Sequence, residues 1–547
     1  MSSAPADPPA HHGAAGGPAA PQIPGHDAVR SGRLAEAIGR ADLHRRRGRV
    51  SELIGLIVEA TGLEAQVGEV CEIAARRGVD AVKAEVVGFR AKRTLLMPLG
   101  EMQGIGPGHV VTATGTQLRT PVGPALLGRV LDGLGAPIDG RGPLEATQSR
   151  PVTAPPPDPL TRPRIHERIG LGVRALDALV PSGVGQRLGI FAGSGVGKSS
   201  LLGMIARSAP PGAAGAGRVN VICLVGERGR EVREFVERDL GAALAQSVVV
   251  VSTSDQPALV RIKAALTATT IAESFRDGGA DVVLMMDSVT RFAMAQREVG
   301  LAIGEPPATR GYTPSVFALL PKLLERSGTS EHGSITGLYT VLVDGDDMNE
   351  PIADAVRSIL DGHIVLTREL AHAGHYPAVD VLASVSRLVG DVTTPAVREA
   401  GMEMRRLLAA HRDKADLIAI GAYERGTDPL VDRAIDLKDH IDRFLRQGLD
   451  EYDPYEAVDQ RPGPAAWRPR SVDAGRRRPS CRRPTSSLPP AWTARRSAEP
   501  RRLVGPARAV ARRRRPSIEL DFRGRVRGSN GRPPSWIRRG GDRPTRP

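Results

Sequence analysis

A glycine-rich octapeptide at residues 192–199 constrains this chain more than any other segment. It reads Ala-Gly-Ser-Gly-Val-Gly-Lys-Ser, between an apolar run at residues 188–192 and an apolar-periodic helical pattern at residues 201–206. A strand, a glycine-rich loop and a helix in this order are the setting in which such a P-loop (Walker A) binds phosphate. The alternative is a plain glycine-rich turn, which the Lys-Ser pair after the last glycine disfavours. Ala192, where the pattern often has glycine, is a mild departure. The segment predicts binding of a nucleoside triphosphate.

The loop also predicts individual roles. Backbone N–H groups of the loop and of the following helix would surround the phosphates. Lys198 would reach the β- and γ-phosphates, and the Ser199 hydroxyl would ligate Mg²⁺. The nucleotide-binding residues expected from this segment are Gly193, Ser194, Gly195, Val196, Gly197, Lys198, Ser199 and Ser200.

Composition limits where the chain works. The three cysteines are widely separated and form neither a metal-binding spacing nor a disulfide framework, so we expect a reducing, cytosolic setting. No apolar run reaches the roughly 18 residues that a membrane span needs. The N-terminus is rich in Ala, Pro, Gly and His and lacks the apolar core of a signal peptide.

The basic charge belongs to the C-terminal segment. From residue 461 onward the chain has 25 arginines, no lysine and 5 acidic residues, a local net charge of +20. The total net charge is +14, so the rest of the chain has a net charge of −6. Such a slightly acidic charge is ordinary for a globular protein. Two explanations of residues 460–547 stay open: translation of GC-rich sequence in a shifted frame, or a basic extension that binds nucleic acid or anionic lipid.

Changes in pattern predict the domain boundaries, since a chain of this length should hold several domains. Residues 1–46 would form a disordered leader with a weak amphipathic helix at residues 27–46. Short β-rich runs at residues 50–58, 68–73, 84–89, 93–98 and 109–113 predict a small β-barrel over residues 47–115. Residues 116–389, with a proline-rich hinge at 151–159, would be the P-loop domain. Residues 390–459 would be a helical domain, and residues 460–547 a disordered tail.

Within the P-loop domain, apolar strands alternate with helical patterns, which predicts a largely parallel α/β sheet. The strands are expected at residues 188–192, 219–225, 247–252, 281–287 and 337–343. The fourth of the five ends in Asp287, whose carboxylate can hold Mg²⁺ beside the loop. Many buried strands end in aspartate, so the argument depends on the P-loop about 90 residues earlier.

Glu227, Arg228 and Glu231 follow the strand at residues 219–225 and should also open at the nucleotide edge. Glu227 is the candidate base that orients and deprotonates the attacking water, and Glu231 could support Mg²⁺. The alternative is a charged helix start, where the helix dipole favours glutamate. Both interpretations stay open on these residues alone.

Two further segments have open interpretations. Arg387, at the end of the serine-rich segment 377–387, is either a surface residue or an arginine finger that enters a neighbour's site, worth roughly 10³–10⁵ in turnover. The Gly/Pro-rich loop at residues 304–314 is either a surface connection or a lining of a ring's central channel.

In this order, the motifs over residues 48–455 resemble the catalytic subunits of rotary ATP synthases and their type III secretion relatives. Residues 191–199, 345–354 and 360–366 look most like the flagellum-specific protein-export ATPases, with the injectisome ATPases as the alternative. The resemblance implies an α/β P-loop (RecA-like) nucleotide-binding core with an N-terminal β-barrel and a C-terminal helical domain. In rotary synthases the catalytic Glu and the finger Arg sit on different subunit types, whereas this chain carries both Glu227 and Arg387. The resemblance, with both residues on one chain, therefore implies a homo-hexameric ring.

The resemblance also implies the chemistry and the partners. ATP is the substrate and Mg²⁺ the cofactor; Lys198, Glu227, Arg228 and Arg387 are catalytic, the last in trans. Ser199, Asp287 and Glu231 bind the metal, and Tyr423 lies where the helical domain closes on adenine. The implied partners are a stator protein at the N-terminus, a central stalk, an export gate and chaperone–substrate complexes, with peripheral membrane association at the inner membrane.

Two other functions remain as alternatives. One is a hexameric RNA-dependent motor, which the near absence of aromatic residues from residues 47–115 disfavours; only Phe89 is present. The other is a non-catalytic ring subunit, which the presence of Glu227 disfavours. Nucleic acid would otherwise be contacted only through the tail.

Overall fold

The computed structural model describes residues 46–74, 80–145, 147–208, 218–343, 345, 347–461 and 463–464. The leader and helix expected before residue 46, and the tail beyond residue 464, lie outside these residues. Among the residues described, no helix combines the length and the apolar composition of a membrane span.

Six antiparallel strands close into the expected N-terminal barrel, in the order β1-β2-β5-β4-β3-β6. Alternate side chains, such as Val58, Ile73 and Leu96, fill its interior. The strands are β1 Arg47–Ile54, β2 Ile57–Thr61, β3 Glu69–Ile73, β4 Val82–Arg90, β5 Arg93–Pro98 and β6 Val110–Gln117. The single run predicted at residues 50–58 was wrong, because Gly55 takes a left-handed φ of +57° and turns the chain into a hairpin.

A nine-stranded sheet forms the centre of the P-loop domain, in the order β19-β18-β12-β17-β15-β13-β14-β8, with β16 paired to β17. The strands from β18 to β8 are parallel. The strands are β8 Val130–Asp132, β12 Arg187–Ala192, β13 Val219–Glu227, β14 Ser247–Thr253, β15 Asp281–Asp287, β16 Gly328–Thr329, β17 Ser334–Leu342, β18 Gly362–Leu366 and β19 Val385–Ser386. All five strands expected here are confirmed within a few residues, whereas β18, β19, β8 and β16 were missed.

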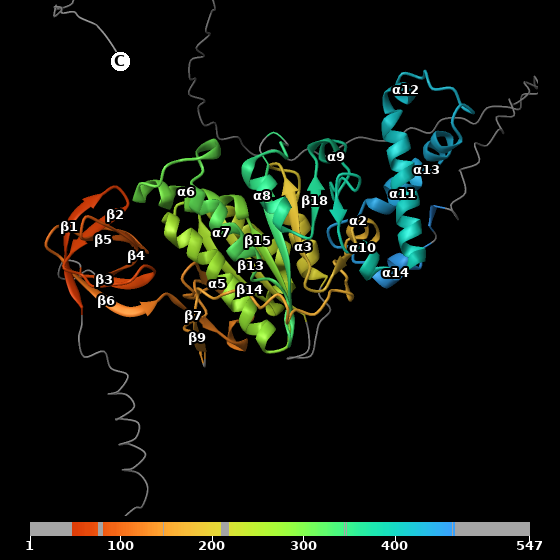
Figure 1. The fold of residues 1–547 in the computed structure, drawn as a ribbon. Coiled ribbons are helices and arrows are strands. Elements are labelled where there is room, and N and C mark those ends of the chain that lie inside the picture. Colours follow the sequence, from red (N-terminus) through yellow and green to blue (C-terminus); the bar gives the residue numbers. More distant parts are fainter. Residues whose placement is uncertain are drawn as a thin grey trace, which may run out of the picture. The chain divides into compact units, whose positions relative to one another are not determined.

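Alternation along each strand divides the core into two layers. In β15, Val282, Leu284 and Met286 join one apolar cluster, while Val283 and Met285 join the other. The first layer is covered by α5 Ala258–Asp277, α6 Val289–Ile303, α7 Pro314–Leu324 and α8 Pro351–Ile359. The second is covered by α2 Arg174–Leu179, α3 Lys198–Arg207 and the C-terminal helices (Figure 1).

Short elements connect these layers. They are β7 Arg119–Val122, η1 Pro124–Leu126, β9 Gln148–Pro151, β10 Arg168–Ile169, β11 Ser182–Gly183, α4 Gly229–Glu234, η2 Phe235–Leu240, η3 Gly241–Gln246, η4 Thr309–Gly311 and α9 Arg368–His372. The expected helical domain consists of α10 Val389–Val392, α11 Pro395–Asp413, α12 Ala415–Ala419, α13 Pro429–Leu445 and α14 Tyr455–Asp459.

In the loop at residues 304–314, Arg310 pairs with Asp347 at 3.3 Å. Whether that loop lines a channel stays a prediction.

The expected proline-rich hinge at residues 151–159 is anchored where it begins. Val152 is buried, its N–H donates to Leu118, and its carbonyl accepts from Arg326 at 2.9 Å and from Thr270 at 3.2 Å. Arg326 is itself buried and forms an ion pair with Glu273 of α5 at 2.6 Å. This pair joins α5, the end of α7 and the segment that follows β9.

Removing one charge from this pair should destabilise the protein strongly. Glu273→Gln leaves the Arg326 guanidinium buried without its counter-charge, and breaking such a pair costs about 3–5 kcal/mol. Glu237→Gln is the matched control, because the Arg233–Glu237 pair is exposed and should contribute less than about 1 kcal/mol. Urea unfolding of the full chain measures both variants. Equal shifts of the two unfolding midpoints would contradict this account of the Arg326 pair.

Candidate nucleotide-binding and catalytic site

The phosphate loop joins the carboxyl end of β12 to the first residue of α3. Gly195 and Gly197 have φ values of +80° and +92°, a left-handed backbone that strains any residue with a Cβ. Val196 between them is buried and holds the loop down. No side chain caps α3 at Gly197, so the first-turn N–H groups and the helix dipole can receive an anion.

Lys198 meets two carboxylates beside this loop. Its Nζ lies 2.5 Å from Oδ1 of Asp287 at the end of β15 and 3.9 Å from Oε1 of Glu227 at the end of β13. Thr340 of β17 donates a hydrogen bond of 2.8 Å to the same Asp287 oxygen. Four neighbouring parallel strands therefore bring the residues named in the sequence to one edge of the sheet.

Glu227 occupies a largely buried position with two cations near it. Its Oε1 lies 3.4 Å from Nε of Arg291, whose side chain covers the backbone at Gly226. Burial, and next the negative charge of Asp287, raise the pKa of Glu227 to about 7, against the opposing effect of Lys198 and Arg291. A carboxyl group with a pKa near neutrality is suited to act as a general base. Arg291 was missed in the sequence because it lies in a helical run without a motif of its own.

Arg228 and Glu231 lie at the rim rather than at the centre. The Arg228 side chain is exposed and pairs with Glu231 at 3.5 Å. Glu231 also contributes to the raised pKa of Glu227. The structure thus connects both residues to the site through Glu227.

The oxygen groups present suit a magnesium ion. Mg²⁺ prefers a few hard oxygen ligands from protein and keeps several waters. The Ser199 side chain is exposed on the first turn of α3, and the Asp287 carboxylate ends the strand beside it. A hydroxyl and a carboxylate beside a phosphate loop are the donor set that this ion takes in nucleotide sites.

A tyrosine that the sequence did not single out lies next to the loop. A Cβ placed on Gly197 would lie 3.6 Å from a ring carbon of Tyr376. Tyr376 is 46% exposed and lines an open cavity of about 740 Å³. The other lining residues are Arg174, Gly374, Asp439, Asp442, Arg443, Arg446, Gln447, Gly448 and Glu451.

Tyr423, named from the sequence, lies elsewhere. Its hydroxyl donates to the Asp428 carbonyl and to Asp432, both at 3.1 Å, within the loop that joins α12 to α13. Figure 1 shows α12 at the end of the helical domain, well separated from α3. The structure therefore does not bring Tyr423 to the phosphate loop of its own chain, and its contact with adenine stays a prediction.

Arg387 lies at the opposite edge of the sheet. It follows β19, whose Ser386 pairs with Gly362 at the amino end of β18. In the parallel pair β12–β18, the carboxyl end Ala192 lies opposite Leu366, four residues further along β18. At about 3.3 Å per residue, roughly 13 Å of strand separates Arg387 from the edge that carries Lys198. One chain therefore does not place Arg387 in its own site.

Three family models match the chain. The ATP synthase alpha/beta family supplies its beta-barrel domain over residues 50–115 and its nucleotide-binding domain over residues 172–386. The chain belongs to the ATP synthase alpha/beta family. The T3SS EscN ATPase C-terminal domain matches residues 393–461. The three parts of the expected fold are thereby confirmed, and the protein is an ATPase of this family.

This chain matches individual relatives over nearly the whole length of each relative. The flagellum-specific ATP synthase of Bacillus subtilis is 54% identical over 426 residues, 76% of this chain and 94% of that protein. The type 3 secretion system ATPase of Xanthomonas euvesicatoria is 51% identical over 413 residues, 75% of this chain and 92% of that one. The solved structure of the assembled ATPase EscN from the enteropathogenic E. coli type III secretion system is 46% identical, with a TM-score of 0.70 over 75% of this chain and 98% of that chain.

The raised pKa of Glu227 predicts the pH dependence of this ATPase. As the base predicted from the sequence, Glu227 would have to be ionised, so kcat/KM should fall below about pH 7, and the fall should approach about tenfold per pH unit at lower pH. Arg291→Gln removes a cation that favours the ionised form, so the acid limb should move to higher pH. Arg297→Gln is the control, because Arg297 lies over the Tyr312 ring of the same region and should leave the limb in place. An unchanged limb in Arg291→Gln would contradict the electrostatic account of Glu227.

Proposed function

We propose that this ATPase works as a homo-hexameric ring and energises protein export by a flagellar type III apparatus. The observation that carries the ring is the separation of Arg387 from Lys198, Glu227 and Asp287 across the sheet. A neighbouring copy that presents its Arg387 edge to this chain's loop edge would complete the site. Repetition of such a head-to-tail contact forms a ring when the rotation between neighbouring copies closes.

The residues at the loop edge divide the reaction among them. Backbone N–H groups of residues 193–197 bind the phosphates, and Lys198 leaves Asp287 to contact the β- and γ-phosphates. Ser199 and Asp287, with support from Glu231, would hold Mg²⁺, which neutralises phosphate charge when bound. Glu227 orients a water for in-line attack on the γ-phosphorus and accepts its proton. The bond from the γ-phosphorus to the β,γ-bridging oxygen breaks, and ADP leaves with that oxygen. Arg387 of the neighbouring subunit stabilises the charge on the transferring phosphoryl group, and Arg228 lines the rim.

Tyr376 is the residue that we propose for the adenine base. Its ring lies beside Gly197, next to an open cavity large enough for an aromatic base. Stacking on an aromatic side chain binds any purine face and leaves the phosphates to the loop. This assignment replaces Tyr423 as the first candidate in this chain.

The transport system follows from the relatives. The flagellum-specific enzyme of Bacillus subtilis is more similar than the secretion ATPase of Xanthomonas euvesicatoria, at 54% against 51% identity. The second candidate is an injectisome ATPase, which the match of residues 393–461 to the T3SS EscN C-terminal domain favours. EscN has been solved in complex with its central stalk EscO, and a stalk protein is a proposed partner here too. The stator, export gate and chaperone–substrate complexes, at the cytoplasmic face of the inner membrane, complete the proposal.

The ring proposal predicts a turnover defect without a binding defect in Arg387→Ala. Turnover should fall about 10³-fold or more, because the finger acts on the transition state. Binding of a fluorescent ATP analogue should stay the same, whereas Lys198→Ala should lose both. Specific activity of the unaltered chain should rise with protein concentration as rings form. Activity independent of concentration and of Arg387 would overturn the shared site.

The base-binding assignment predicts a KM effect. Tyr376→Ser should raise KM for ATP by about 5- to 150-fold, the equivalent of the ~1–3 kcal/mol of one stacking contact, with little change in kcat. Tyr423→Ser is the matched control and should leave KM unchanged. The reverse result would return the base to Tyr423.

A further inference from the structure

Arg387 combines a free side chain with a firmly held backbone. Among the residues that the structure describes, its guanidinium makes no ion pair, and its one hydrogen bond, to the Arg357 carbonyl, is long at 3.5 Å. Its backbone N–H donates to the carbonyl of Asp361 at 3.0 Å. The Oγ of the preceding Ser386 accepts from the buried Gln186 at 3.1 Å. An arginine that acts on an anion of another subunit needs a backbone that is held in a fixed position.

Asp361 is the residue to which this backbone is attached. Its carbonyl accepts from Arg387 and also from Gln186 at 3.1 Å. Its carboxylate receives Nε and the terminal NH2 group of Arg187 at 3.0 and 3.1 Å, and the Arg187 backbone N–H at 3.1 Å. Two parallel bonds between a guanidinium and a carboxylate fix relative orientation as well as distance. The position of Asp361 is therefore set by the first residue of β12.

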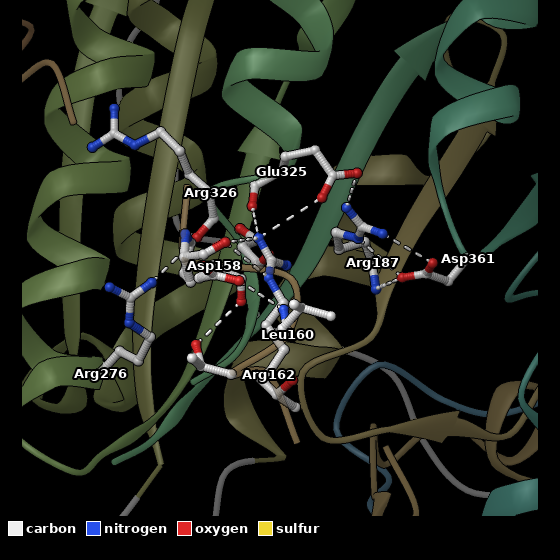
Figure 2. Close-up of polar contacts among 12 residues, drawn as sticks. Asp158, Leu160, Arg162, Arg187, Arg276, Glu325, Arg326 and Asp361 are labelled. Atoms are coloured by element: carbon white, nitrogen blue, oxygen red, sulfur yellow. Dashed lines mark hydrogen bonds and ion pairs between the residues drawn. The ribbon is translucent and has the colours of Figure 1, made fainter. Parts of the chain in front are cut away.

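A second carboxylate holds Arg187 from the other side. The terminal NH1 of Arg187 lies 2.5 Å from Glu325, the residue that caps the end of α7, and Figure 2 shows Arg187 between Glu325 and Asp361. Arg162 donates to the Glu325 carbonyl at 2.5 Å and to the Ser327 carbonyl at 3.0 Å. A continuous set of contacts thus leads from α7 through Arg187 and Asp361 to Arg387.

We propose that Arg187 and Asp361 are positioning residues that set the reach of Arg387 into the neighbouring site. They act through the Arg387 backbone and touch no substrate. The inference rests on the proposed function, in which Arg387 acts in trans. Displacement of a catalytic group by about 1 Å can cost about 10²-fold in rate. Loss of the Arg187–Asp361 pair should therefore lower kcat and leave KM for ATP unchanged.

A complementation assay with two inactive variants tests the loop of one chain and the Arg387 of another chain separately. Lys198→Ala has no working loop but can donate Arg387, and Arg387→Ala has a working loop but no finger. Mixed in one ring, they should restore turnover at the interfaces where a Lys198→Ala chain faces an Arg387→Ala chain. Asp361→Asn is then added to one chain at a time. Added to the finger donor, it should reduce the restored turnover by about 10- to 100-fold; added to the acceptor, it should change it by less than about twofold.

A matched control comes from the other end of the sheet. Arg129 and Asp139 form the same two-bond pair, at 2.7 and 2.9 Å, next to β8. Asp139→Asn in the donor should leave complementation unchanged. Arg187→Lys is the second variant, since lysine cannot make both bonds to Asp361. Light scattering and ATP-analogue binding verify ring assembly and the intact loop in each mixture.

Each outcome decides between explanations. A loss only in the donor supports positioning of Arg387. An equal loss in donor and acceptor would show a general structural role and overturn the inference, and so would full activity in both. Absence of complementation between the two parent variants would instead refute the trans action of Arg387, and with it the proposed ring site on which the inference rests.

Discussion

The parallel direction of strands β18 to β8 is the constraint on which the rest of the molecule depends. It collects Lys198, Glu227 and Asp287 at the carboxyl ends of the strands. Glu227 and Asp287 are the last residues of β13 and β15, and Lys198 begins α3 after the loop that follows β12. The same polarity places Arg387 at the amino edge. No change of a side-chain rotamer can bridge the length of a strand, so the proposed role of Arg387 requires the site of a second subunit.

Positive and negative side chains balance one another at the carboxyl ends of the strands, so the site is neutralised without a nucleotide. Two cations, Lys198 and Arg291, face two carboxylates, Asp287 and Glu227, in a largely buried setting. In the proposed mechanism, binding of ATP exchanges the contact of Lys198 with Asp287 for a contact with phosphate, so the affinity for ATP reflects the difference between two ion pairs. Burial and the charge of Asp287 outweigh the two cations and raise the pKa of Glu227 to about 7.

The sequence predicted the features that depend on local pattern. Residues 192–199 and the five longest apolar runs of the P-loop domain were placed correctly because a loop motif and strand periodicity are local signals. The five-residue β18 carries too short a signal, and a single glycine at residue 55 divided one expected strand into two. Tyr376 was missed because its significance comes from Gly197, about 180 positions away, which no spacing rule connects.

The same reasoning separates Arg387 from the residues that hold it. A motif could single out Arg387, because its neighbours in sequence belong to a recognisable segment. Arg187, Glu325 and Asp361 lie far from it in the chain and meet only because β12 and β18 are adjacent and parallel and α7 ends beside them. A sequence motif can therefore identify Arg387 as a candidate finger, whereas the position of its backbone depends on which strands and helices are neighbours in the fold. In the proposed ring, in which each chain carries both Glu227 as the base and Arg387 as the finger, the sites at all interfaces are identical only if this topology holds Arg387 in one position.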